Sequence, residues 1–365
     1  MRVVLLTSAN GWRGSGASYA KIAHGLGQRG HAVHLVTAAP RVTARFLADG
    51  LDVSQIPGQN TGLPEINALW RSLRLSKAQA VLVDTPRDVR LAVYATLAHR
   101  APIVYRYNLN YRGARDHLAD RLYLSRVAAY VFQSRYIRER AHEDIHWIAR
   151  RRVYQIANGY DTSRYRHQAE AATAFRSKWS IPGNSLVVLT SAKLVRDKGH
   201  EVAIAGLDQV RRSGMELLYL VCGDGGREAE LRKLAQACGL SVLFTGLLEL
   251  DEMVAALSAA DVVVHPSPQE IFPNAVGEAM SCGRAVVAAD AGGSAELLGR
   301  DGRTGILVPP GQPEALAAAV TGLLKDAALR ASIGAAARQR IELEFPLEMM
   351  IDRYEAALEE IVRTS

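Results

Sequence analysis

The sequence predicts an α/β protein built from two doubly wound, Rossmann-like domains. The chain has 365 residues, enough for two hydrophobic cores. Short apolar runs rich in Val, Ile and Leu alternate with helical patterns, as in parallel sheets covered by helices. The apolar runs show no polar alternation, which indicates strands buried on both faces. The alternation stops once and then restarts, which marks a second domain.

The first domain, residues 1–160, is expected to carry the opening strand–helix units. Its strands are predicted at residues 3–7, 32–37, 80–84, 103–107, 129–133 and 152–156. Helices are expected at 15–29, near 89–99 and near 118–123, each placed between two of these strands. This order fits a parallel sheet with helical crossovers.

The second domain is expected at residues 161–345, after a boundary near Asn158-Gly159. Its strands are predicted at residues 186–191, 217–222, 242–245, 262–265, 285–288 and 306–308. A final amphipathic helix, at about 346–365, has one apolar face and is expected to pack back on the first domain. Because ligands bind at the carboxyl ends of parallel strands, two such domains predict a ligand cleft between them.

The composition disfavours a membrane-spanning protein and a disulfide-rich one. Hydrophobic residues make up 48% and charged residues 22%, a globular balance without an apolar run of bilayer length. The short N-terminal apolar run reads as a buried strand, not a signal peptide, so we expect a cytoplasmic protein. The three cysteines are widely spaced and predict neither a metal site nor a disulfide framework.

The positive charge is concentrated in the first half. Residues 1–160 hold 23 Lys and Arg against 10 Asp and Glu, whereas residues 161–365 hold 21 against 27. Twelve arginines lie between residues 100 and 152. A basic half suits nucleic acid, an anionic membrane surface or an anionic substrate, or it reflects solvated helix faces. No lysine-rich tail or recognition motif supports nucleic acid.

Two glutamates flank the loop that joins strand 262–265 to the next helix. Glu270 lies on the loop and Glu278, eight residues later, lies on the helix. The start of a helix offers free N–H groups to phosphate, while carboxylates accept hydrogen bonds from hydroxyls. A ligand with phosphates in the middle and a polyol at each end satisfies both. The alternative is that Glu278 only interacts with the helix dipole from the first turn and that Glu270 is a surface loop residue.

A second candidate cluster follows strand 186–191. Lys193 and Lys198 are five residues apart on one loop, which suits a diphosphate or is merely an exposed basic loop. Glycines at 14 and 16, and in Gly223-Asp224-Gly225, let backbone approach a ligand. The third glycine of the dinucleotide fingerprint is absent from both, so a nicotinamide or flavin enzyme is disfavoured.

These features together resemble the retaining glycosyltransferase family 4, which has the GT-B fold, over nearly the whole chain. The resemblance rests on these motifs: Gly14-Ser15-Gly16-Ala17-Ser18, Arg29-Gly30-His31-Ala32-Val33, Asn158-Gly159-Tyr160-Asp161, Gly223-Asp224-Gly225, Glu270-x7-Glu278, Gly292-Gly293-Ser294-Ala295-Glu296 and Thr304-Gly305-Ile306-Leu307-Val308-Pro309.

The resemblance implies roles for individual residues. Glu278 would hold the ribose hydroxyls of a nucleotide donor, and Glu270 would bind hydroxyls of the transferred sugar. Lys198 matches the lysine of the family, whereas Lys193 stands where arginine is usual and Ala192 where glycine is usual. With Glu270, these two lysines are the catalytic candidates. The remaining donor-binding candidates are Gly16, Gly223, Gly246 and the backbone of Phe272, Asn274 and Ala275.

The acceptor side is predicted on the first domain. Many family members carry a histidine after the strand at 103–107, and this chain has Asn108 there. Arg106, expected on the same loop, could contact an anionic acceptor. Trp12 and Arg13, on the first loop, could line the acceptor cleft.

The implied activity is transfer of a sugar from a nucleoside-diphosphate sugar to an acceptor hydroxyl, with retention and without a cofactor or divalent metal. The basic first domain favours a glycolipid or cell-surface polysaccharide precursor as acceptor, and it allows peripheral contact with the inner face of an anionic membrane. Two alternatives remain: a nucleotide-sugar epimerase on the same fold, and a non-catalytic homologue that binds sugar nucleotides. The sequence identifies neither the sugar nor the nucleobase.

Overall fold

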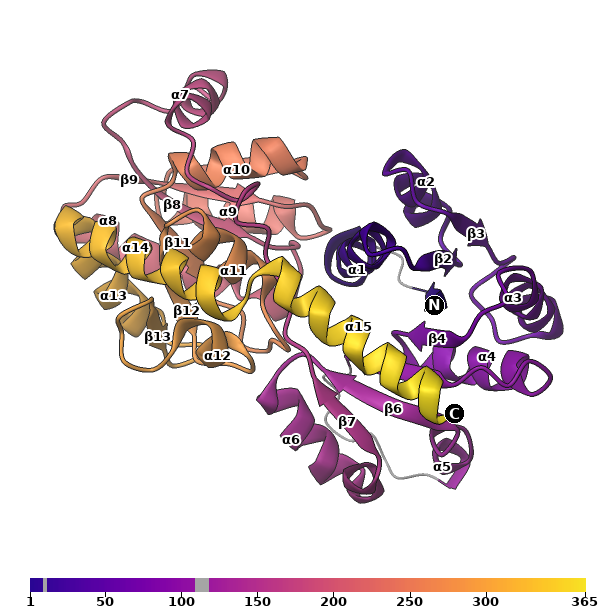
Figure 1. Cartoon of the computed structure of the whole chain (residues 1–365). Coiled ribbons are helices and arrows are strands. Elements are labelled where there is room, and N and C mark those ends of the chain that lie inside the picture. The colour runs from indigo at the N-terminus through magenta and orange to yellow at the C-terminus, as the bar shows by residue number, and fades with distance from the viewer. Residues whose placement is uncertain (9–11, 109–117) are drawn as a thin grey trace. The chain divides into compact units, whose positions relative to one another are not determined.

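The computed structural model describes residues 1–8, 12–108 and 118–365 (Figure 1). The chain forms two compact units. The first unit contains Met1–Gly159 together with Leu347–Ser365, and the second contains Tyr160–Pro346. Each unit is built on its own parallel sheet, so the predicted pair of doubly wound sheets is confirmed.

The sheet of the first unit has seven strands within the described residues, in the order β3-β2-β1-β4-β5-β6-β7. The strands are β1 (Arg2–Thr7), β2 (Ala32–Thr37), β3 (Val53–Gln55), β4 (Ala80–Val83), β5 (Ile103–Tyr107), β6 (Val127–Phe132) and β7 (Arg152–Gln155). The sequence analysis missed β3. This edge strand has three residues, none of them fully buried, so it lacks an apolar run.

Helices connect these strands. They are α1 (Ala17–Gln28), α2 (Pro40–Ala48), α3 (Leu63–Leu75), α4 (Pro86–Thr96), α5 (Leu118–Leu124), α6 (Arg135–Asp144) and α15 (Leu347–Thr364), with short turns η1 (Trp12–Gly16) and η2 (His146–Arg150). Helix α4 begins earlier than expected because Thr85 caps it and Pro86 occupies its first position.

The last helix, α15, belongs to the core of the first unit although it follows the second unit in sequence. Its buried face packs in one apolar cluster with α1, and Ile351 and Tyr354 are fully covered there. Gly25 of α1 makes this possible, because a Cβ at that position would lie 2.5 Å from Cγ1 of Ile351.

The second unit contains six strands in the order β10-β9-β8-β11-β12-β13, counted over the described residues. They are β8 (Leu186–Ser191), β9 (Leu217–Cys222), β10 (Val242–Gly246), β11 (Val262–His265), β12 (Ala285–Ala289) and β13 (Ile306–Val308). The helices are α7 (Ala169–Lys178), α8 (His200–Arg212), α9 (Glu228–Ala237), α10 (Leu250–Ala259), α11 (Asn274–Ser281), α12 (Ser294–Leu298), α13 (Pro313–Lys325) and α14 (Ala327–Glu344), with the turn η3 (Arg196–Lys198).

Each sheet has one point at which the chain reverses the direction of strand addition. In the first unit this switch point lies between β1 and β4, and in the second between β8 and β11. Ligands of doubly wound sheets bind outside the carboxyl ends of the strands at such a point. No helix in the described ranges combines the length and the apolar character needed to cross a bilayer.

The packing of α1 against α15 gives a test with an internal control. We expect Gly25→Ala to destabilise the protein by about 1–3 kcal/mol, because the added methyl group overpacks the core. The penalty should shrink in an Ile351→Ala background, where the methyl group has room. Gly27→Ala, in the same helix but with nothing near its Cβ position, should be neutral or stabilise by up to about 1 kcal/mol. Urea unfolding of Gly25→Ala, Ile351→Ala, the double variant and Gly27→Ala measures these free energies. Equal destabilisation by Gly25→Ala and Gly27→Ala would contradict the packing.

Candidate functional site

The loops that follow β8 and β11 meet at the switch point of the second sheet. Lys198, in the turn after β8, places its Nζ 2.5 Å from Oε1 of Glu270, on the loop after β11. The glutamate side chain is largely buried and the lysine is half-buried. The two residues lie 72 positions apart in sequence, so only the sheet order brings them together.

His265 joins this pair. It is the last residue of β11, it is buried, and its Nε2 lies 2.9 Å from the same Oε1 of Glu270. Burial would raise the pKa of Glu270, but the hydrogen bond and charge of His265 and those of Lys198 lower it to about 2. Glu270 is therefore an ionised acceptor at neutral pH. The sequence analysis missed this contact, for which the position of His265 at the end of a strand was the available signal.

Glycines hold the loop that carries Glu270. Gly292 has φ +56°, and a Cβ there would lie 1.5 Å from the carbonyl oxygen of Glu270. Gly293 packs similarly on the next carbonyl, and Gly199, with φ +66°, would place a Cβ 2.4 Å from the oxygen of Pro266. No other residue type fits these contacts, so the close approach of three glycines fixes the backbone around Glu270.

The loop that carries Lys193 is fixed in the same way. A Cβ on Gly223 would lie 1.9 Å from the oxygen of Ala192, and one on Gly225 would lie 2.5 Å from the oxygen of Leu194. The backbone on both sides of Lys193 is thus held, while its side chain is exposed. Gly246, at the end of β10, pairs with Gly223 in a short antiparallel bridge. The two candidate lysines and the candidate glycines of the second unit, Gly223 and Gly246, therefore lie at the carboxyl ends of neighbouring strands.

Helix α11 begins at Asn274, directly after this loop. Asn274 and Ala275 are half-buried and form its first turn. Phe272 is buried, and its ring centroid lies 5.8 Å from that of Phe345. Its side chain therefore belongs to the core, and only its backbone is available to a ligand.

Glu278, the second glutamate, lies half-buried on α11. Tyr165 hydrogen-bonds to it, and the ring of Tyr160 lies over Gly277, where a Cβ would come within 2.0 Å of the ring. Burial raises the pKa of both tyrosines, so both stay protonated. Tyr165 carries no sequence signal for this role, because the fold alone brings it to Glu278.

The prediction that Arg106 contacts an anionic acceptor is wrong. Arg106 lies inside β5, not on a loop, and is only 4% exposed. Its guanidinium donates from Nη1 to Oδ1 of Asp84 and from Nη2 to Oδ1 of Asn158, each at 3.1 Å. A buried charge requires such partners, so this arginine stabilises the first unit and is not open to a ligand.

Asn108 follows β5 and is half-buried. Its Nδ2 donates to Oδ1 of Asp84 at 3.0 Å and lies 3.5 Å from Oγ of Ser15. Because Ser15 precedes α1 and Asp84 follows β4, this polar group lies at the switch point of the first sheet. Gly16, the last residue of η1, adjoins it in sequence and lies in the first unit, not beside Glu270.

The first loop carries two candidates for the acceptor side, the aromatic Trp12 and the basic Arg13, and the structure describes the side chain of Trp12 only. Trp12 packs edge-on against Phe46, with ring centroids 5.2 Å apart, and Arg45 lies over its ring. These contacts give Trp12 a packing role in the first unit. The side chain of Arg13 lies outside the described part of the structure.

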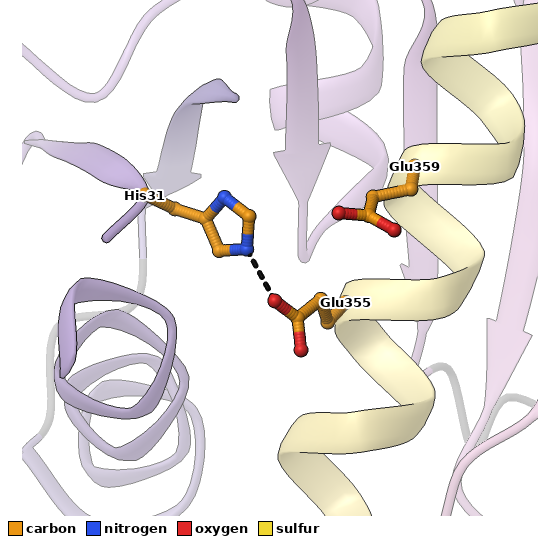
Figure 2. Close-up of side chains that lie close together, drawn as sticks. All are labelled: His31, Glu355 and Glu359. Carbon is orange, nitrogen blue, oxygen red and sulfur yellow. Dashed lines mark hydrogen bonds and ion pairs between the residues drawn. The ribbon is translucent and has the colours of Figure 1, made fainter. Parts of the chain in front are cut away.

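One cluster in the first unit has the composition of a metal site. Ligand atoms of His31, Glu355 and Glu359 lie within 4.8 Å of one another, the only such group among the described residues (Figure 2). However, Nε2 of His31 lies 2.5 Å from Oε1 of Glu355, and Nη1 of Arg29 lies 2.7 Å from Oε2. Both carboxylate oxygens are engaged, so the cluster acts as an ion-pair network that fastens α15 beside β2.

The lowered pKa of Glu270 links stability to pH. The unfolded carboxyl titrates near 4.5 and the folded one near 2, so the unfolded state binds more protons between these values. We expect Glu270→Gln to cost roughly 3 kcal/mol above pH 4.5, and the difference from wild type to shrink as pH falls toward 2. Urea unfolding at several pH values measures this difference.

The control is Glu252→Gln, which removes an exposed partner of Lys178 at the same 2.5 Å separation. Exposed pairs contribute little, so this variant should match wild type at every pH. If the difference in free energy of unfolding between wild type and Glu270→Gln does not change with pH, the buried ion pair is contradicted.

Comparisons with known proteins agree with the two-unit architecture. Residues 172–340 match the family described as glycosyl transferases group 1, and residues 12–164 match glycosyltransferase family 4. A Corynebacterium glutamicum GDP-mannose-dependent monoacylated alpha-(1-6)-phosphatidylinositol monomannoside mannosyltransferase is 30% identical over 206 residues, 54% of each chain. Sulfoquinovosyl transferase SQD2 of Arabidopsis thaliana is 42% identical over 146 residues, 40% of this chain and 28% of that protein. The chain spans about half, or less, of the length of these relatives.

Solved structures show the same fold at low identity. A glycosyltransferase from Rickettsia africae superposes with a TM-score of 0.89 at 17% identity, covering 100% of this chain and 99% of that one. Anabaena Alr3699/HepE in complex with UDP-glucose gives 0.85 at 21% identity, covering 98% and 99%. With matches to both family descriptions and this fold, the chain belongs to the group 1 glycosyltransferases of family 4 and has the GT-B fold.

Proposed function

We propose that the protein transfers a sugar from a nucleoside-diphosphate sugar to an acceptor hydroxyl, with retention of anomeric configuration. One observation carries the proposal: Lys198 and Glu270 meet at the switch point of the second sheet, beside the first turn of α11. A cation, the positive end of a helix and a carboxylate in one place suit a ligand that combines phosphate with hydroxyls.

The diphosphate would bind to Lys198, Lys193 and the first turn of α11. An ammonium group has three hydrogens, so Lys198 can keep its contact with Glu270 and still donate to a phosphate oxygen. Lys193 is exposed and can turn toward the same oxygens. These charges and amides would stabilise the leaving diphosphate without a divalent metal.

The two glutamates would bind the two sugar rings that flank the diphosphate, the transferred sugar and the ribose. Lys198 and His265 both bond Oε1 of Glu270, which leaves Oε2 to accept from a hydroxyl of the transferred sugar. Glu278 would accept from the ribose hydroxyls, with Tyr165 holding its carboxylate. Each contact matches a hydroxyl donor with a carboxylate acceptor.

Retention without an enzymic nucleophile fits this geometry. With a pKa of about 2, Glu270 is a poor base for the proton of an acceptor hydroxyl, and Nε2 of His265 is bonded to that carboxylate. The leaving phosphate oxygen is then the base, which removes the proton while the acceptor oxygen attacks from the same face. The protein contributes position and charge stabilisation.

The acceptor class is inferred from charge and from relatives. The Corynebacterium glutamicum relative is named for a phosphatidylinositol mannoside, which is a glycolipid. The first unit of this chain carries the excess of basic residues, which favours an anionic glycolipid or polysaccharide precursor and action at an anionic membrane surface. Attraction would come from exposed arginines, since Arg106 is buried. We do not assign a nucleic-acid partner.

Replacing the site residues should separate this function from its alternatives. We expect Lys198→Met and Glu278→Gln each to lower kcat/KM for sugar transfer by on the order of 10²-fold, because each removes a group that stabilises or positions the donor. Lys233→Met, an exposed lysine of α9, is the matched control and should retain full activity. Equal rates in all three variants would refute the site.

A panel of UDP-, GDP- and ADP-linked sugars should identify the donor by thermal shift, since a ligand that binds only the folded state raises Tm. With that donor, NMR of the product should show the same anomeric configuration as the donor. A new sugar nucleotide formed without any acceptor would instead indicate the epimerase. Binding of a donor with no turnover on any acceptor would indicate the non-catalytic homologue.

A further inference from the structure

Helices α3 and α4 of the first unit expose large apolar side chains to solvent. They lie side by side (Figure 1). Leu63 is 82% exposed, Tyr94 53% and Leu97 59%, and Trp70 is half-buried between them. These four residues line one shallow groove. Such large side chains are normally covered, so a contiguous group of them indicates a surface that binds something.

The exposed charges of the segment that carries this groove all have one sign. Between residues 63 and 100 the exposed charged side chains are Arg71, Arg74, Lys77, Arg90 and Arg100. The guanidinium of Arg74 lies over the ring of Trp70, at 5.4 Å from its centroid. The apolar groove therefore lies on a segment whose exposed charged side chains are all cations, and one of them, Arg74, lies over a ring that lines the groove.

The acidic residues of the same segment are all buried and engaged elsewhere. Glu65 accepts from the backbone N–H of Gly62 at the start of α3, and Asp88 accepts from Thr85 at the start of α4. Asp84, also buried, pairs with Arg106. None of these carboxylates offsets the surface cations, so the exposed charge of residues 63–100 is entirely positive.

We propose that this α3–α4 face, comprising Leu63, Trp70, Tyr94 and Leu97 with the five exposed cations of residues 63–100, docks on an anionic lipid bilayer. Leucine, tryptophan and tyrosine side chains enter the boundary between headgroups and acyl chains, while arginines attract anionic headgroups. A second copy of the chain fits poorly, because it would bring the exposed cations of one copy against those of the other. The inference deepens the proposed acceptor class and rests on it only for its biological purpose.

The test is co-sedimentation of the full chain with vesicles of phosphatidylcholine alone or phosphatidylcholine with phosphatidylglycerol. Wild type should bind the anionic vesicles, and the binding should weaken as salt screens the cations. Leu63→Asp with Leu97→Asp, and separately Arg71→Glu with Arg74→Glu, should each lower binding by about tenfold or more. These side chains are exposed, so the fold should persist, as circular dichroism can verify.

Matched controls come from the second unit. Leu343→Asp, at a leucine that is 65% exposed on α14, controls for loss of apolar surface. Lys233→Glu with Arg303→Glu, both exposed, controls for loss of charge. Both controls should bind vesicles as wild type does. All variants should keep the thermal shift given by the nucleotide sugar, which isolates membrane docking from donor binding.

Several results would overturn the inference. One is equal binding of wild type to neutral and anionic vesicles, and another is binding of the face variants at the level of the controls. Self-association of wild type that Leu63→Asp with Leu97→Asp abolishes, without vesicle binding, would assign the face to a second copy. None of these results bears on sugar transfer, which is measured in solution with soluble donor.

Discussion

The site depends on one buried carboxylate whose charge is balanced by two neighbours. Glu270 would be protonated or displaced if it were buried alone, since desolvation disfavours its charge. His265 and Lys198 both act on one of its oxygens and hold it ionised. The histidine comes from the end of β11 and the lysine from the turn after β8, so the order of strands in the sheet sets the electrostatics of the site.

Backbone packing then determines where these groups stand. Gly199 and Gly292 admit carbonyl groups at distances that any side chain would block, and Gly223 does the same for the loop of Lys193. The site is therefore built on closely packed loops at the ends of strands, and its rigidity comes from contacts that only glycine permits. Such preorganisation is what electrostatic stabilisation of a leaving group requires.

The first unit uses its charges differently. Arg106, Asp84 and Asn158 satisfy one another inside the unit, whereas Arg71, Arg74 and Arg90 remain at the surface beside exposed apolar groups. Net charge alone does not distinguish these two uses. The helix α15 completes the core of this unit, so residues of β1 and α15, which lie far apart in the sequence, belong to one apolar cluster.

Apolar periodicity in the sequence was enough to establish the two parallel sheets and most strand positions, because these follow from local pattern. The roles of Glu270 and Glu278 in binding a ligand stay predictions. The three-residue strand β3 left no such pattern. Tertiary structure alone decided that Arg106 is buried, that His265 and Lys198 share an oxygen of Glu270, and that Tyr165 reaches Glu278. The physical reason is that burial and long-range contacts depend on how strands are ordered across the sheet, which no local window of sequence records.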